Sequence, residues 1–256
     1  MAVVFKRRKD GRAKTSGLTL VELMVVIALT ALLSALLLPA LSTAKEKSRR
    51  TVCKSNERQL LAVLRMYAYE NEDYFPSCAD NKGYYHSIRL SDAVFTNLVD
   101  EAGGNTNIFY CPNIVFGSTN SPVQQHDPQY GYIIGYNYLV YGISSSIKAP
   151  DSTIMPVKWP STSTNELLAD ANYWTPAQSS AGYFPAQMIV VPHAAMGTVT
   201  SHGSSFTIGL PGGNCAGVGA VGGNIGLVDG SVHWWSLSQM QTNDASSVEN
   251  DAYGNW

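Results

Sequence analysis

Charged side chains are scarce in this 256-residue chain, because Asp, Glu, Lys and Arg together make up only 14% of it. An average soluble domain carries about 25%. This scarcity excludes a coiled coil, a highly charged disordered chain and a basic protein that binds nucleic acid. Hydrophobic residues reach 45%, so a chain of this length holds one large domain or two small ones with a real core.

Basic residues are nearly missing from most of the chain, since only Lys82, Arg89, Lys148 and Lys158 follow the first 72 positions. Residues 1–17, by contrast, hold six Lys or Arg residues and one Asp. An acidic body behind a basic leader argues against nucleic acid as a partner. The positive-inside rule places such a leader in the cytoplasm.

One long apolar run, residues 18–41, contains a single ionisable side chain, Glu22. At about 1.5 Å per residue, a helix of this length spans the ~30 Å hydrocarbon core of a membrane. A secretory signal peptide has a shorter apolar run and an A-x-A-like cleavage site, which residues 42–44 match poorly. A plain membrane anchor explains the length but not Glu22, because a carboxylate in an apolar helix costs a few kcal/mol.

Residues 14–22, KTSGLTLVE, resemble the processing site of type IV prepilins and type II secretion pseudopilins. Those proteins have a basic leader that ends in Gly, an apolar first mature residue and Glu at the fifth mature position. The resemblance implies that a prepilin peptidase cuts between Gly17 and Leu18 and then N-methylates Leu18. Phe is the commonest first residue in these families, so Leu18 departs from their pattern while remaining apolar.

The same resemblance implies roles for two residues of the apolar run. The Glu22 carboxylate would pair with the terminal amine of a neighbouring subunit, which neutralises both charges in hydrocarbon and sets the register of assembly. Pro39 lies where many of these proteins place a helix-kinking proline, and it removes one backbone donor. The implied partners are other pilin or pseudopilin subunits, an inner-membrane assembly platform and the lipid bilayer.

The helical pattern continues beyond the apolar run, so we expect one helix from about Leu18 to about Glu70, amphipathic over residues 42–72. With a leader at residues 1–17 and a β-rich head at residues 73–256, the expected fold class is α+β and pilin-like, a long N-terminal helix packed on an antiparallel sheet. Arg49, Glu57, Arg58 and Arg65 lie largely off the predicted apolar face. The residues of that face are Leu41, Ala44, Ser48, Val52, Cys53, Asn56, Leu60, Val63, Leu64 and Tyr67.

The expected location is a single pass through the cytoplasmic (inner) membrane, with the N-terminus in the cytoplasm and the head outside it. A second basic group at residues 45–54 weakens the charge asymmetry on which this orientation rests. The head would then belong to a periplasmic or surface filament.

Short elements are expected in the head: a helix at 92–99, a strand at 108–112, one or two strands at 130–139 and a strand or helical turn at 166–170. The clearest element is a hairpin at residues 224–235, whose Asp229-Gly230 pair favours a two-residue turn. Such a turn places Leu227 opposite Val232.

Four cysteines follow the apolar run: Cys53, Cys78, Cys111 and Cys215. In an oxidising compartment they allow three disulfide pairings, and the residues alone leave all three open. Residues 51–76 resemble a subset of prepilin-like proteins with a Cys-x-x-Asn-x-x-Gln-Leu stretch, in which a helix Cys and a Cys-Pro often occur together. That resemblance implies a Cys53–Cys111 bridge and leaves Cys78 to pair with Cys215.

No Cys-x2-Cys and no Cys/His pair has the spacing of a zinc site, so we expect no metal ion and no cofactor. Calcium stays open, because Asp229, Asp244, Glu249 and Asp251 supply oxygens without a diagnostic loop spacing.

These features predict a structural filament subunit without enzymatic activity. One alternative is a membrane-anchored protein that binds a glycan or an envelope partner and uses the prepilin route only for export. Another is an anchored hydrolase, in which His193 or His202 would meet an acid in a cleft.

Overall fold

The computed structural model describes residues 19–83, 85–114, 125–140, 166–174, 189–194, 199–201, 215, 217, 219–244 and 253–256. The chain divides into two units, residues 1–45 and residues 46–256. The predicted cleavage junction between Gly17 and Leu18 lies outside the described residues.

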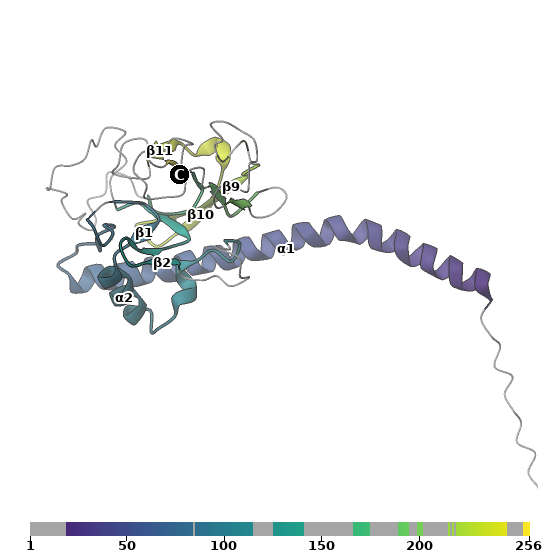
Figure 1. Ribbon diagram of the computed structural model, residues 1–256, viewed down its shortest axis with the longest axis horizontal. Helices are drawn as coiled ribbons and strands as arrows, with labels where there is room; N and C mark the ends of the chain where they lie inside the picture. Colours follow the sequence, from purple (N-terminus) through teal and green to yellow (C-terminus); the bar gives the residue numbers. More distant parts are fainter. Residues whose placement is uncertain are drawn as a thin grey trace, which may run out of the picture. The chain divides into compact units, whose positions relative to one another are not determined.

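A single helix, α1, runs from Leu20 to Glu70 over 51 residues (Figure 1), which agrees with the predicted extent. Hydroxyl groups in its apolar part donate hydrogen bonds to carbonyl oxygens of the preceding turn. Because these hydroxyls are satisfied within the helix, they do not interrupt its apolar surface. The donors are Thr30, Ser34, Ser42 and Thr43.

The second part of α1 is amphipathic, as predicted, but its buried face differs from the expected one. The members of the predicted face that are exposed are Leu41, Ala44, Ser48 and Val52. Val52 is 46% exposed, whereas Glu57 is fully buried. Glu57 follows Cys53 by four residues and precedes Leu60 by three, so helical geometry places it on the buried face despite its charge. The buried residues are Cys53, Glu57, Leu60, Leu61, Val63, Leu64 and Ala68.

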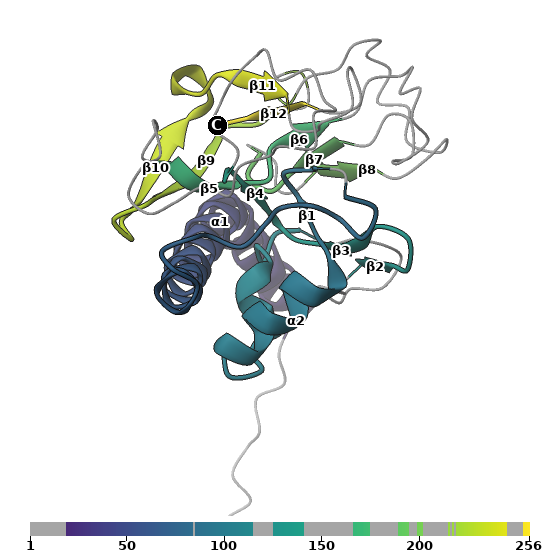
Figure 2. The same cartoon turned by 90° about the vertical axis from the view of Figure 1, so that its left-hand side faces the viewer.

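Among its described residues, the head contains three antiparallel sheets, whose strands are labelled in Figure 2. One has the strand order β10-β9-β5-β4, the second β11-β12-β6-β7-β8 and the third β1-β3-β2. With α1, these sheets give the predicted α+β fold. The strands are β1 (Arg89–Leu90), β2 (Gln125–Asp127), β3 (Gly131–Ile133), β4 (Tyr136–Tyr138), β5 (Glu166–Asp170), β6 (Tyr173–Trp174), β7 (Ile189–Val191), β8 (Val199–Ser201), β9 (Gly222–Leu227), β10 (Val232–Ser236), β11 (Thr242–Asp244) and β12 (Tyr253–Asn255).

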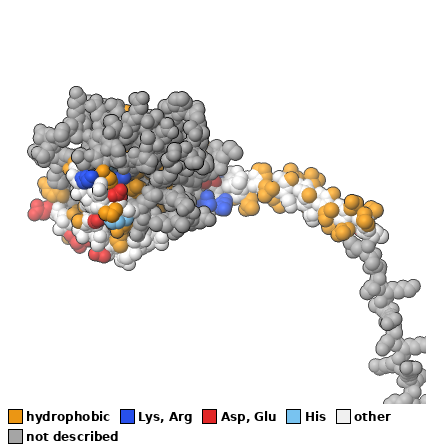
Figure 3. All heavy atoms as spheres, viewed as in Figure 1, with side chains coloured by type: hydrophobic (Ala, Val, Ile, Leu, Met, Phe, Trp, Pro, Cys, Tyr) orange, Lys and Arg blue, Asp and Glu red, His pale blue; other side chains and the backbone are white. Residues whose placement is uncertain are grey.

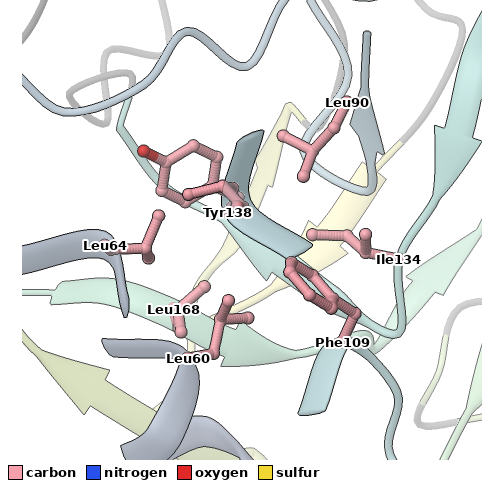
Figure 4. Close-up of a pocket in the computed structure, with 8 residues that line it drawn as sticks. Leu60, Leu64, Leu90, Phe109, Ile134, Tyr138 and Leu168 are labelled. Atoms are coloured by element: carbon pink, nitrogen blue, oxygen red, sulfur yellow. The ribbon is translucent and has the colours of Figure 1, made fainter. Parts of the chain in front are cut away.

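The buried face of α1 packs on the four-stranded sheet. A Cβ at Gly226 on β9 would lie 2.9 Å from Leu61 Cδ1, so the helix and the sheet approach closely here and a larger residue would displace the end of the Leu61 side chain. Beside this contact, Leu60 and Leu64 of α1 share a small apolar pocket with residues from the sheet and from the segments that follow α1 (Figure 4). The lining is completed by Leu90, Leu98, Phe109, Ile134, Tyr138 and Leu168.

The predicted hairpin is present as β9 and β10, but its register differs by one residue. Val232 pairs with Gly226 rather than with Leu227. The Leu227 backbone N–H donates to the Ser231 carbonyl oxygen at 2.8 Å, which leaves a three-residue loop. Gly230 has φ +88°, and a left-handed third residue is typical of three-residue hairpin loops.

The predictions for the shorter elements are confirmed in part. Helix α2 spans Asp92–Glu101, capped by the Ser91 side chain, and β3 and β4 confirm two strands within 130–139. The expected strand or turn at 166–170 is strand β5. The expected strand at 108–112 is wrong: Thr106–Phe109 form a 3-10 helix, η1, because the Asn105 side chain accepts from the Asn107 backbone and caps a turn there. A second 3-10 helix, η3, spans Leu237–Gln239.

Candidate functional site

The first turn of α1 holds Glu22 in a reciprocal cap. The backbone N–H and the hydroxyl of Thr19 both donate to Glu22 Oε2, each at 2.8 Å, and the Glu22 backbone N–H donates to Thr19 Oγ1 at 3.2 Å. This is the capping-box arrangement of a helix start. The cap fixes the carboxylate at the positive end of the helix, directly beside the predicted cleavage junction. Sequence reasoning noted Glu22 but missed this local role of Thr19.

Residues 19–45 are all exposed, so the apolar part of α1 has no buried face. Figure 3 shows hydrophobic side chains along the side of this helix that faces the viewer. Leu20 and Leu36, for example, are each 71% exposed. This helix is long and apolar enough to cross a membrane. A helix that is hydrophobic all round is normally covered, either by lipid or by other protein.

The comparison with protein families decides what this segment is. Residues 12–38 match the prokaryotic N-terminal methylation motif. The N-terminal segment of this protein is of the prepilin type. The matched range contains the Gly17-Leu18 junction and Glu22, the positions on which the sequence-based prediction rested.

A curated relative of this chain is type II secretion system core protein G of Pseudomonas aeruginosa, which is 35% identical over 63 residues. The match covers 25% of this chain and 44% of that protein. The chain thus spans less than half the length of the curated relative that it matches. No solved structure matches the chain.

Pro39 lies inside α1, and the helix continues through it. Because its ring nitrogen carries no hydrogen, Pro39 cannot donate the helical hydrogen bond to the carbonyl oxygen one turn earlier. On its other side, the Pro39 carbonyl oxygen accepts from both Ser42 Oγ and Thr43 Oγ1, at 2.8 and 3.0 Å. The structure therefore places a locally weakened point in the apolar part of α1, and the assembly roles of Glu22 and Pro39 stay predictions.

The predicted disulfides are absent from the structure, where all four cysteines are free and buried. Cys78 belongs to the main hydrophobic core and Cys215 to a separate cluster, so these two do not pair. Cys53 and Cys111 do lie close together, but each thiol has a polar partner. Cys53 Sγ lies 2.8 Å from Asp170 Oδ1, and Cys111 Sγ lies 3.6 Å from His193 Nε2.

Asp170 and His193 complete a polar cluster in the interior of the head. His193 Nε2 lies 3.3 Å from Asp170 Oδ2, and His193 Nδ1 lies 2.8 Å from Glu46 Oε1. The Asn224 backbone N–H and side-chain amide both donate to Asp170 Oδ2, at 2.6 and 3.0 Å. These partners come from four different elements, which is why the sequence did not bring them together.

Charge pairing sets the pKa values in this cluster. Burial opposes ionisation of Asp170, but the His193 charge and the hydrogen bonds from His193 and Asn224 hold the pKa of Asp170 below its ordinary value. Burial likewise opposes a charged His193, but Asp170 raises its pKa above the ordinary range. In Glu46, hydrogen bonds from His193 and Arg50 outweigh the effect of burial and lower the pKa.

The hydrolase alternative predicted an acid beside His193 or His202. His193 does meet Asp170 and Glu46, but His193, Asp170 and Cys111 are all 0% exposed. A substrate has no access to them within the described part of the chain. His202 lies outside the described residues.

The Asp229-Gly230 turn has a structural explanation. Asp229 Oδ1 accepts from the Ser231 backbone N–H at 2.8 Å, which stabilises the loop of the hairpin. The other oxygen donors considered for calcium, the side chain of Asp244 and residues Glu249 and Asp251, lie outside the described residues. The calcium prediction stays untested.

Proposed function

We propose that this chain is a structural subunit of a membrane-anchored filament, either a pseudopilin of type II-type secretion or a type IV pilin-like protein. The observation that carries the proposal is the methylation motif at residues 12–38 followed by a helix whose apolar half has no buried face. Such a helix is suited first to the bilayer and then to a bundle of identical helices.

In the proposed pathway, a prepilin peptidase removes the leader after Gly17 and methylates Leu18. The new amine belongs to Leu18, four residues before Glu22 in the sequence. Because the Thr19 cap holds the Glu22 carboxylate at the helix start, the carboxylate is oriented to meet the amine of a neighbouring subunit. A buried carboxylate and amine stabilise assembly only when they are paired, so the pair fixes the stagger between helices.

The proposed location is the cytoplasmic (inner) membrane, with the leader inside and the head outside. The proposed partners are the prepilin peptidase, other pilin or pseudopilin subunits and an inner-membrane assembly platform. The proposed contribution of the chain itself is assembly rather than catalysis.

The test compares Glu22→Gln with Glu70→Gln, a matched change at the exposed far end of the same helix. Both full-length variants are expressed in cells that contain the assembly machinery, and membrane-bound chains are chemically cross-linked and sheared. We expect Glu22→Gln to lose oligomers at least tenfold while its leader is still removed, and Glu70→Gln to resemble the unmodified chain.

Equal oligomer yields from the two variants would contradict the role of Glu22. A processed wild-type chain that remains monomeric would contradict the filament proposal and favour the anchored binding protein.

A further inference from the structure

Four metal-ligand side chains converge inside the head. Cys53 comes from α1, Cys111 follows η1, Asp170 ends β5 and His193 follows β7. All four are 0% exposed, and their ligand atoms lie within 4.8 Å of one another. We propose that Cys53, Cys111, Asp170 and His193 form a closed tetrahedral site for a divalent metal ion, with zinc as its occupant.

The spacing of the donor atoms fits a small tetrahedral ion. Zinc bonds of about 2.0–2.3 Å place pairs of ligand atoms roughly 3.3–3.8 Å apart. Here His193 Nε2 lies 3.3 Å from Asp170 Oδ2 and 3.6 Å from Cys111 Sγ. Cys53 Sγ lies 2.8 Å from Asp170 Oδ1, so a small outward shift accommodates the ion. Thiolate, imidazole and carboxylate are all common zinc ligands.

Two of the four proposed ligands, His193 and Asp170, are held in place by hydrogen bonds to further residues. His193 Nδ1 lies 2.8 Å from Glu46 Oε1 and donates to it. His193 Nε2 faces Asp170 and Cys111, where a bound metal ion would replace the Nε2 proton. A carboxylate on the far nitrogen is the usual way in which proteins orient a histidine toward a metal. Asp170 is oriented in the same way by the two Asn224 donors.

A fifth buried group points independently to a cation. Glu57 is 0% exposed, and neither of its carboxylate oxygens has a hydrogen-bond partner of acceptable geometry within the described residues. It lies on the same face of α1 as Cys53 and interacts electrostatically with Asp170 and Cys111. Two thiols and two carboxylates thus face a single imidazole. A divalent cation bound among these groups would be stabilised by the thiolates and carboxylates around it.

A Cys53–Cys111 disulfide is the competing interpretation, because the two thiols are close and the predicted compartment is oxidising. A disulfide uses only two of the four donors. It gives no reason for a carboxylate and an imidazole to converge on the same point. A metal ion uses all four and joins α1 to β5 and to two connecting segments.

The experiment measures metal in the full-length chain, purified in mild detergent without chelator or reductant. Elemental analysis is expected to give about one zinc per chain. After exchange with Co²⁺, the same protein should show the sulfur-to-cobalt charge-transfer band and the visible bands of tetrahedral cobalt. This inference does not depend on the filament proposal, since it concerns the interior of the head alone.

Substitutions of the proposed ligands test whether the ion binds at this cluster. Cys111→Ser and His193→Gln should reduce the bound zinc to a small fraction of one equivalent. Cys78→Ser and Cys215→Ser, which change buried cysteines outside the cluster, should keep it. If the cluster variants fail to fold, the zinc content and cobalt spectrum of the unmodified chain decide the question.

Three results would overturn the proposal. The first is a metal-free chain with a Cys53–Cys111 disulfide in a non-reducing peptide map. The second is a metal-free chain with four free thiols. The third is zinc that Cys111→Ser and Cys78→Ser retain equally.

Discussion

The two halves of α1 belong to one continuous helix but have opposite surroundings. Large side chains between Leu20 and Leu41 are more than half exposed, whereas Leu60, Leu61 and Leu64 are almost completely buried against the head. Both halves are rich in leucine, so hydrophobicity alone does not distinguish them. The second half has its partner within the chain. The first half has no such partner within the described part of the chain, and it is long and apolar enough to cross a membrane.

The largest difference in stability is expected when one leucine in each half of α1 is replaced by alanine. Leu64→Ala removes a side chain that is 1% exposed, and it should cost about 2–5 kcal/mol in the free energy of unfolding of the head. Leu33→Ala removes one that is 61% exposed and should leave that free energy unchanged. Urea unfolding in mild detergent, followed by tryptophan fluorescence, measures both. Equal losses would show that the two halves do not differ in packing.

Mildly acidic pH should lower the free energy of unfolding of the head. It should not change the packing of the apolar half of α1, where Glu22 is the one ionisable residue. Burial and the nearby Arg89 charge lower the pKa of His86 from 6.5 to about 3. Between these values the unfolded chain binds a proton that the folded chain excludes, so stability falls as the pH drops below 6.5. At pH 5 the loss is about 2 kcal/mol, from 1.36 kcal/mol per pH unit.

The matched variant for this pH effect is His86→Gln, which cannot take up the proton. Urea unfolding at pH 7 and pH 5 should give a smaller difference for this variant than for the unmodified chain. Identical pH differences in the two proteins would exclude His86 as the cause.

The smallest effect is expected at the exposed edge of the buried half. Arg65 Nη1 donates to the Asp229 carbonyl oxygen at 3.2 Å, a contact between α1 and the hairpin turn that lies in solvent. Such contacts contribute little, so Arg65→Ala should change the free energy of unfolding by less than about 0.5 kcal/mol. Arg58→Ala is the control on the same helix, and a loss at Arg65 comparable to that of Leu64→Ala would be inconsistent with this ranking.

The sequence predicted those features that local periodicity determines. The extent of α1, its exposed and buried halves, and the place of the hairpin all follow from patterns within a few turns or residues. The hairpin register did not follow, because Asp229-Gly230 is compatible with both two-residue and three-residue loops. Glu57 was assigned to solvent because of its charge, although its spacing from Cys53 and Leu60 places it on the buried face.

The buried cluster was beyond sequence reasoning. Cys53, Cys111, Asp170 and His193 are separated by more than twenty residues at each step, so no ligand spacing connects them. Only the fold brings their donor atoms within 4.8 Å of one another. The one available signal was the joint occurrence of a helix Cys and a Cys-Pro. It correctly placed Cys53 near Cys111, but the structure does not contain the disulfide that it implied.

The proposed function requires that the apolar half of α1 begins at a prepilin cleavage site. The most direct measurement is the intact mass of the membrane-bound chain after co-expression of the full-length protein with a prepilin peptidase. The expected product starts at N-methylated Leu18. A Gly17→Leu variant should stay uncut. An uncut wild-type chain, or a product that starts beyond Leu41, would contradict it.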